Sequence, residues 1–110
     1  MQTHEFGIML TDPKKGKRYA KYQPKKYNCI SVRDADIEPF YEELDKVPCY
    51  WFIYDGIPEY GLQTTGVTLI PPDSLSAVRE IVSKNPNLAE LCDLLSKAKE
   101  INKYVIHFGI

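Results

Sequence analysis

The stretch CYWFIYD, residues 49–55, is the most apolar run of the chain and indicates where a sheet is built. In an extended conformation Cys49, Trp51 and Ile53 point to one side, and Tyr50, Phe52 and Tyr54 point to the other. A strand that is apolar on both faces is typical of the middle of a sheet that is covered on each side. We therefore predict a central strand over residues 49–55.

Other segments on either side of this run predict further strands. Near the N-terminus, Phe6, Ile8 and Leu10 alternate with other residues, which predicts a strand with one buried face. The turn-forming sequence that follows predicts a hairpin with a basic tip, whose returning strand covers residues 17–23. The last residues suit a terminal strand, although Ile101, Val105 and Phe108 would also continue a helical stripe. The remaining expected strands are 27–32, 62–70 and 103–110.

Three segments have the apolar period of helices. Between residues 37 and 47 an apolar stripe follows Asp36, a candidate N-cap, with Pro39 in the first turn. Asp73 can cap a second helix over residues 74–84, and Asn85 with Pro86 opens a third. The three buried stripes are Ile37, Phe40, Tyr41, Leu44 and Val47; Leu75, Val78, Ile81 and Val82; and Leu88, Leu91, Leu94, Leu95 and Ala98.

Strands therefore occur in neighbouring groups, without a strict alternation of strands and helices. This order predicts an α+β fold, with a mainly antiparallel sheet of about five strands and about three helices packed on one face. A chain of 110 residues has the size of one domain, so we assign residues 1–110 to a single domain.

Composition and the N-terminal sequence bear on location. The three cysteines are odd in number and widely spaced, which is typical of a reducing compartment. The first residues lack the basic and apolar regions of a signal peptide, and no apolar run reaches the length that spans a bilayer. We expect a soluble cytoplasmic protein that does not enter membranes.

The sequence KKGKRYAKYQPKKY, residues 14–27, is the strongest charge feature. Seven basic residues and one carboxylate between residues 12 and 26 give a local charge of +6, against −1 for the whole chain. Such a strip could bind phosphates, or it could be the solvated, aggregation-resistant tip of a hairpin that contacts a protein. Lysine outnumbers arginine, the better bidentate phosphate ligand, so we favour the second interpretation. The candidate residues are Lys14, Lys15, Lys17, Arg18, Lys21, Lys25 and Lys26.

A counterpart segment from Arg33 to Glu59 carries eight acids and two basic residues, a local charge of −6. Two opposite patches would make the molecule dipolar and suit charged protein partners. Eight tyrosines add a second sign of a recognition surface, because a tyrosine buries a large area and keeps a polar tip. The candidate aromatic binding residues are Tyr19, Tyr22, Tyr27, Tyr54 and Tyr60.

Enzyme chemistry has little support in the sequence. His4 and His107 lie near opposite ends of the chain, and their spacing to the cysteines matches neither a zinc site nor a thiol–base pair. Asp55 and Glu59 flank a turn whose geometry is not fixed, and no glycine-rich nucleotide motif occurs. We predict a non-enzymatic interaction protein without a cofactor or metal, whose partner is a protein. The alternative is a nucleic-acid-binding module that uses residues 14–27, and a homodimer stays open.

Overall fold

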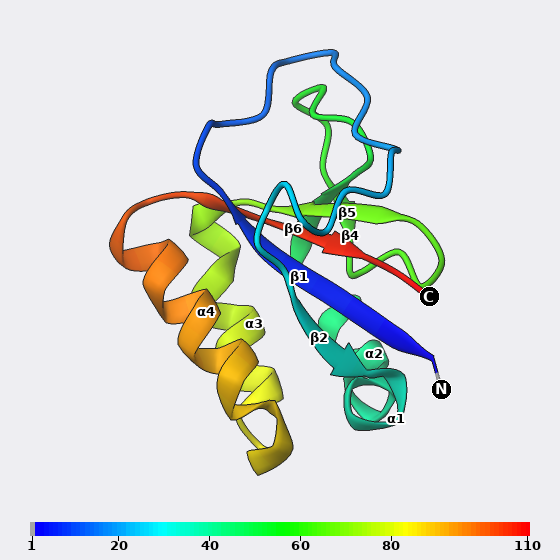
Figure 1. Ribbon diagram of the computed structural model, residues 1–110, viewed down its shortest axis with the longest axis vertical. Coiled ribbons are helices and arrows are strands. Elements are labelled where there is room, and N and C mark those ends of the chain that lie inside the picture. The colour runs from blue at the N-terminus through cyan, green and yellow to red at the C-terminus, as the bar shows by residue number, and fades with distance from the viewer. Residues whose placement is uncertain (1) are drawn as a thin grey trace.

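The computed structural model describes residues 2–110 and has one antiparallel sheet of six strands, with the helices packed on one face (Figure 1). This confirms the α+β prediction, with one strand more than expected. The strand order across the sheet is β2-β1-β6-β5-β3-β4. The strands are β1 (Thr3–Met9), β2 (Ile30–Arg33), β3 (Pro48–Trp51), β4 (Glu59–Tyr60), β5 (Val67–Ile70) and β6 (Tyr104–Phe108).

The two long helices form where the sequence predicts them. Helix α3 (Pro72–Val82) begins directly after Pro71, with Asp73 in its first turn but without a side-chain cap. The second begins with a 3₁₀ turn, η2 (Pro86–Leu88), and continues as α4 (Ala89–Glu100). The Asn85 side chain accepts a hydrogen bond from the backbone of Asn87, as the predicted cap requires. The expected terminal strand after α4 is also confirmed, as β6.

The helix predicted over residues 37–47 is broken into three pieces, and the Asp36 cap is wrong. The pieces are α1 (Asp34–Ile37), η1 (Glu38–Phe40) and α2 (Tyr41–Leu44), and Arg33 occupies the N-cap position of α1. Because Pro39 has no N–H and its ring crowds the preceding turn, one α-helical ladder cannot run through it from Asp34.

Strand β3 is shorter than predicted and does not lie at the centre of the sheet. It ends at Trp51 because Phe52 takes a positive φ of 48°, which extended structure does not allow. It pairs with β5 on one side and with the two-residue β4 on the other. The strand predicted over residues 62–70 is also shorter than expected, because only β5 forms there. The middle of the sheet is formed by β6 and β5 instead.

The hairpin predicted after the first strand is wrong. Residues 10–29 form a long loop over the face of the sheet opposite the helices, and their only ladder contact is an isolated bridge between Arg18 and Ile53. Strand β1 pairs instead with β2 and β6. The prediction that this strand has one buried face is also wrong. Phe6 packs on the helix side of the sheet, Met9 packs on the other side, and Leu10 is exposed.

The sheet thus separates two apolar cores. The helix-side core joins Phe6 and Val105 to the stripes of the helices, including Leu44, Leu75 and Leu95. The second core lies under residues 10–29 and contains Met9, Val67, Leu69, Ile106 and Phe108, with partly buried aromatic side chains packed against them. The loop is therefore a cover for one face of the sheet, although it has no regular structure.

Candidate functional site

We call residues 10–29 the basic loop, because it carries the seven basic side chains that the sequence singles out. All seven are exposed to solvent. Two backbone hydrogen bonds fasten the loop to the segment after β3, from Gly16 N to Tyr54 O at 2.8 Å and from Tyr19 N to Phe52 O at 2.5 Å. The two segments lie together at the top of Figure 1. The positive charges therefore stand on a backbone that is held in place, and not on a free hairpin tip.

Aromatic side chains fix the basic loop to the sheet. Tyr19, Tyr27 and Tyr54 are partly buried and pack against the second core. Tyr22 stands edge-on to the ring of Phe108 at 5.4 Å and donates a hydrogen bond to the Glu5 carboxylate. Tyr19, Tyr27 and Tyr54 thus help to hold the loop against the sheet, whereas the Tyr22 side chain stays 62% exposed.

Three of the cationic side chains of the basic loop also lie over aromatic rings. Lys17 lies 5.2 Å from the Tyr19 ring centre, and Lys26 lies 5.4 Å from that of Tyr27. Such contacts stabilise exposed sites by about 0.5–1 kcal/mol each. Arg18 is placed in the same way over Phe52. Tyr60 is separate from this arrangement, because it lies exposed on the edge strand β4.

A groove of about 690 Å³ runs between the basic loop and helix α4. Its lining contains Lys14, Lys17, Lys26 and Lys97, but also Asp12, Glu90 and Asp93. The positive charges of the groove are therefore interrupted by carboxylates. Its lining also includes apolar side chains, among them Leu10, Leu94 and Ile101.

The acidic segment lies mostly at the other end of the molecule. Helices α1 and α2, which carry four of its acids, are in the lower part of Figure 1, and the basic loop is at the top. Asp55 is an exception, since it follows β3 and accepts a hydrogen bond from Ile57 N beside the basic loop. The basic loop and helices α1 and α2 therefore lie at opposite ends of the molecule, and the dipolar surface stays a prediction.

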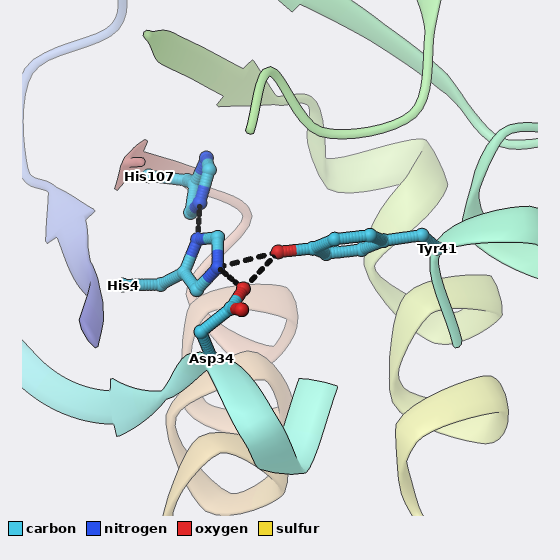
Figure 2. Close-up of polar contacts among 4 residues, drawn as sticks. All are labelled: His4, Asp34, Tyr41 and His107. Atoms are coloured by element: carbon cyan, nitrogen blue, oxygen red, sulfur yellow. Dashed lines mark hydrogen bonds and ion pairs between the residues drawn. The ribbon is translucent and has the colours of Figure 1, made fainter. Parts of the chain in front are cut away.

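A buried polar network crosses the helix-side core (Figure 2). His4 Nδ1 lies 2.8 Å from His107 Nε2, and His4 Nε2 lies 2.7 Å from both Asp34 Oδ1 and the Tyr41 hydroxyl. The Tyr41 hydroxyl in turn donates to Asp34. Strands β1 and β6 position the two histidines, and the broken helix 34–44 supplies the carboxylate and the phenol.

The partners determine which nitrogens carry protons. The Asp34 carboxylate only accepts, so His4 donates to it through Nε2–H. In neutral His4 the other nitrogen, Nδ1, is then an acceptor, and His107 donates to it through Nε2–H. His107 Nδ1 is left as a buried acceptor without a partner among residues 2–110.

The network shifts the acidity of three of its members. Burial, and then the nearby His4, lower the pKa of His107 well below its usual range. Hydrogen bonds from Tyr41 and His4 lower the pKa of Asp34, and burial raises the pKa of Tyr41. At neutral pH these shifts favour a neutral His107, an ionised Asp34 and a protonated Tyr41.

A substrate has no route to the imidazoles of this network. Both histidines are 0% exposed, and the Asp34 side chain is 22% exposed. Sequence reasoning missed the pair because His4 and His107 are 103 positions apart and meet only through the β1–β6 pairing. No local pattern reports such a contact.

The cysteines are packing residues of the two cores. Cys49 and Cys92 are buried, Cys29 is partly buried, and all three are free thiols. Burial raises the pKa of Cys49 to about 12, that of Cys29 to about 11, and also that of Cys92. The thiolate is the nucleophilic form of cysteine, and a raised pKa leaves almost none of it at neutral pH.

We therefore expect all three cysteines to react more slowly than a free thiol with a neutral-pH thiol reagent in the folded protein. The measurement is the rate of labelling, followed residue by residue by mass spectrometry. The same protein in denaturant is the control and should label rapidly at all three positions. Rapid labelling of any one in the folded state would contradict the assignment as packing residues.

At Gly7 the end of the basic loop passes close to β1. A Cβ atom placed on Gly7 would lie 2.6 Å from the Tyr27 carbonyl oxygen and 2.7 Å from Cys29 Sγ. Gly7→Ala should therefore push the end of the loop off the strand and cost about 1–3 kcal/mol of unfolding free energy. Urea unfolding measures the loss, and the rate of tryptic cleavage within residues 14–26 measures the loosening.

Gly16→Ala is the control for this substitution. Gly16 has a φ of +83° but nothing within 4 Å of an added Cβ, so its cost comes from the backbone alone. It should not expose Tyr27 or Cys29. A Gly7→Ala protein with the stability and cleavage rate of the wild type would show that the close approach is absent.

Comparisons of the chain with protein-family models, with curated proteins and with solved structures give no match. Within residues 2–110, no set of three or more His, Cys, Asp or Glu side chains is arranged to hold a metal ion. No helix in that range is long and apolar enough to cross a membrane. The interpretation of the site therefore depends on the geometry of the basic loop, the groove and the buried network.

Proposed function

We propose that this chain is a non-enzymatic interaction protein that binds another protein through the basic loop and the groove beside it. The observation that carries the proposal is the fixed display of seven exposed cations on a loop whose aromatic residues are used as anchors. A surface that is already ordered loses little conformational entropy when a partner binds.

Two observations support a role without catalysis. The histidines that meet are fully buried, and three of their four ring nitrogens contact one another, Asp34 or Tyr41, so we infer that they stabilise the fold and do not touch a substrate. The three thiols have raised pKa values, which is the opposite of what a nucleophilic cysteine needs. A reducing compartment suits these free thiols, and we propose a cytoplasmic location.

The alternative function is nucleic-acid binding by residues 14–27. A continuous basic groove would favour it, because each phosphate contact adds affinity that is independent of sequence. The groove instead places Asp12, Glu90 and Asp93 among its lysines, where they would repel phosphates. The interrupted charge favours a protein partner.

A matched pair of triple variants tests the proposal. Lys14, Lys15 and Lys21 in the basic loop are changed to Gln, and so, in the control, are Lys46, Lys84 and Lys99. Both changes remove three exposed positive charges, and each should alter the unfolding free energy by less than about 1 kcal/mol. Affinity capture from native extract should recover a nuclease-resistant protein that the loop variant loses and the control variant keeps.

Oligonucleotide binding distinguishes the alternative. A nucleic-acid-binding loop would retain single strands, with a log–log salt slope of about −0.7 for each phosphate contacted. Retention at physiological salt by the wild type and the control, but not by the loop variant, would defeat the proposal. Capture that is unchanged in both variants would also defeat it.

A further inference from the structure

The groove beside α4 has the composition of a protein-docking site. Leu10 and Ile101 are 75% and 42% exposed, and both line it. Exposed apolar side chains gathered in one concave place mark an interaction site, whereas isolated ones do not. Charged side chains line the same groove, and a mixture of apolar and charged groups is the composition of a protein interface.

One face of α4 forms a wall of this groove. The residues of that wall are Glu90, Asp93, Leu94, Lys97 and the C-cap residue Ile101, with the spacing i, i+3, i+4, i+7 and i+11. Such spacing places side chains along one side of a helix. At 1.5 Å per residue the wall is about 16 Å long, enough for about five residues of an extended chain or eleven of a helix.

The charges of the groove select the kind of partner. Four lysines and three carboxylates line it, and one of the carboxylates, Asp12, already lies 3.9 Å from Lys103. The neighbouring lysines of the basic loop add to the positive side. A segment whose carboxylates are spaced among apolar side chains can meet the lysines without facing these three carboxylates. A polyanion carries a charge at every phosphate and would leave Leu10 and Ile101 uncovered.

We infer that the groove between the basic loop and α4 binds an acidic, amphipathic segment of another protein, which inserts apolar side chains between Leu10, Leu94 and Ile101. This inference rests on the proposed function and specifies the partner and its place of contact. The lysines at positions 14, 17, 26 and 97 pair with carboxylates of that segment.

Site-specific photocrosslinking tests the inference. p-Benzoylphenylalanine replaces Leu10 or Ile101 in the groove, or Ile57 or Tyr60 as controls, which are also exposed and apolar but lie elsewhere. Each protein is irradiated in native extract, with and without nuclease, after its melting temperature has been checked against the wild type. Mass spectrometry then identifies the crosslinked peptide.

We expect nuclease-resistant adducts from the two groove positions and not from the controls. The crosslinked peptide should hold Leu, Ile or Phe residues flanked by Asp or Glu. A synthetic peptide of that sequence should bind the wild type at least tenfold more tightly than Ile101→Ser, because a residue at the centre of an interface contributes most of the affinity.

The other outcomes separate the two proposals. Adducts from Ile57 or Tyr60 alone would overturn the groove assignment and leave protein binding in place. Nuclease-sensitive adducts, or no adducts at any position, would overturn both. A crosslinked peptide from a second copy of this chain would make the groove a self-association surface, and a basic peptide would contradict the charge argument.

Discussion

Leu44→Ala should lower the free energy of unfolding by about 2–5 kcal/mol, because it removes a fully buried side chain from the helix-side core and leaves a cavity. Leu44 is the last residue of α2, and it holds the broken helix 34–44 against the other helices. The same segment supplies Asp34 and Tyr41 to the histidine network. Loosening this segment therefore affects apolar packing and polar contacts together.

Phe40→Ala is the matched control for Leu44. The sequence alone would assign it a cost of about 3–5 kcal/mol if the ring were fully buried. The Phe40 ring is only partly buried, so its truncation should cost less than that of Leu44. Urea unfolding of the two variants gives the comparison. A loss below about 1 kcal/mol for Leu44→Ala would contradict the docking of this segment.

Lowering the pH from 7 to 5 should reduce the free energy of unfolding, by at most about 1.4 kcal/mol for each pH unit. His107 titrates near pH 6.5 in the unfolded chain, but its pKa in the folded protein is well below that. Between these two values the unfolded chain binds more protons than the folded one. Stability is therefore fully present above about pH 6.5 and falls, by up to about 1.4 kcal/mol per pH unit, as the pH decreases.

The groups that face His107 define the control for the pH prediction. His4 lies on its Nε2 side, Phe6 packs against its ring, and Asp34 and Tyr41 are reached through His4. The pKa of Asp34 is lowered, so its contribution to stability is lost only below about pH 4.

His107→Gln keeps a donor at the position of Nε2 and cannot take up a proton in this pH range. It should therefore flatten the dependence between pH 7 and pH 5, as measured by urea unfolding at each pH. Equal stability of the wild type at the two pH values, or an unchanged slope in the variant, would disprove the role of His107.

Local signals predict most of the helix-side elements. Asn85 and Pro86 mark a helix start whose geometry depends on residues within a few positions, and the apolar period then identifies the buried stripe of α4. The same applies to α3 and to β6. A proline in a first turn costs little, but the helix begins at Asp34, so Pro39 lies in its interior and breaks it.

The features that the sequence does not predict depend on contacts between residues that are far apart in the chain. The tyrosines of residues 17–23 have the pattern of a strand, but burial against Met9, Ile106 and Phe108 keeps this segment as a loop. The histidine network depends on a pairing across 103 positions, and its acidic member comes from a third element. The seven basic candidates could be predicted as a set, but the groove beside them requires α4 to be in place.

The position of β6 has a consequence for synthesis on the ribosome. Strands β2 and β1 lie on one side of it, and β5, β3 and β4 lie on the other. Residues 104–108 are translated after all the other strands, so the nascent chain holds two separate strand groups with unpaired edges until β6 emerges. Pairing of such distant segments is slow, and exposed edges favour aggregation. Closure of this sheet is therefore a late event, completed when β6 pairs with β1 and β5.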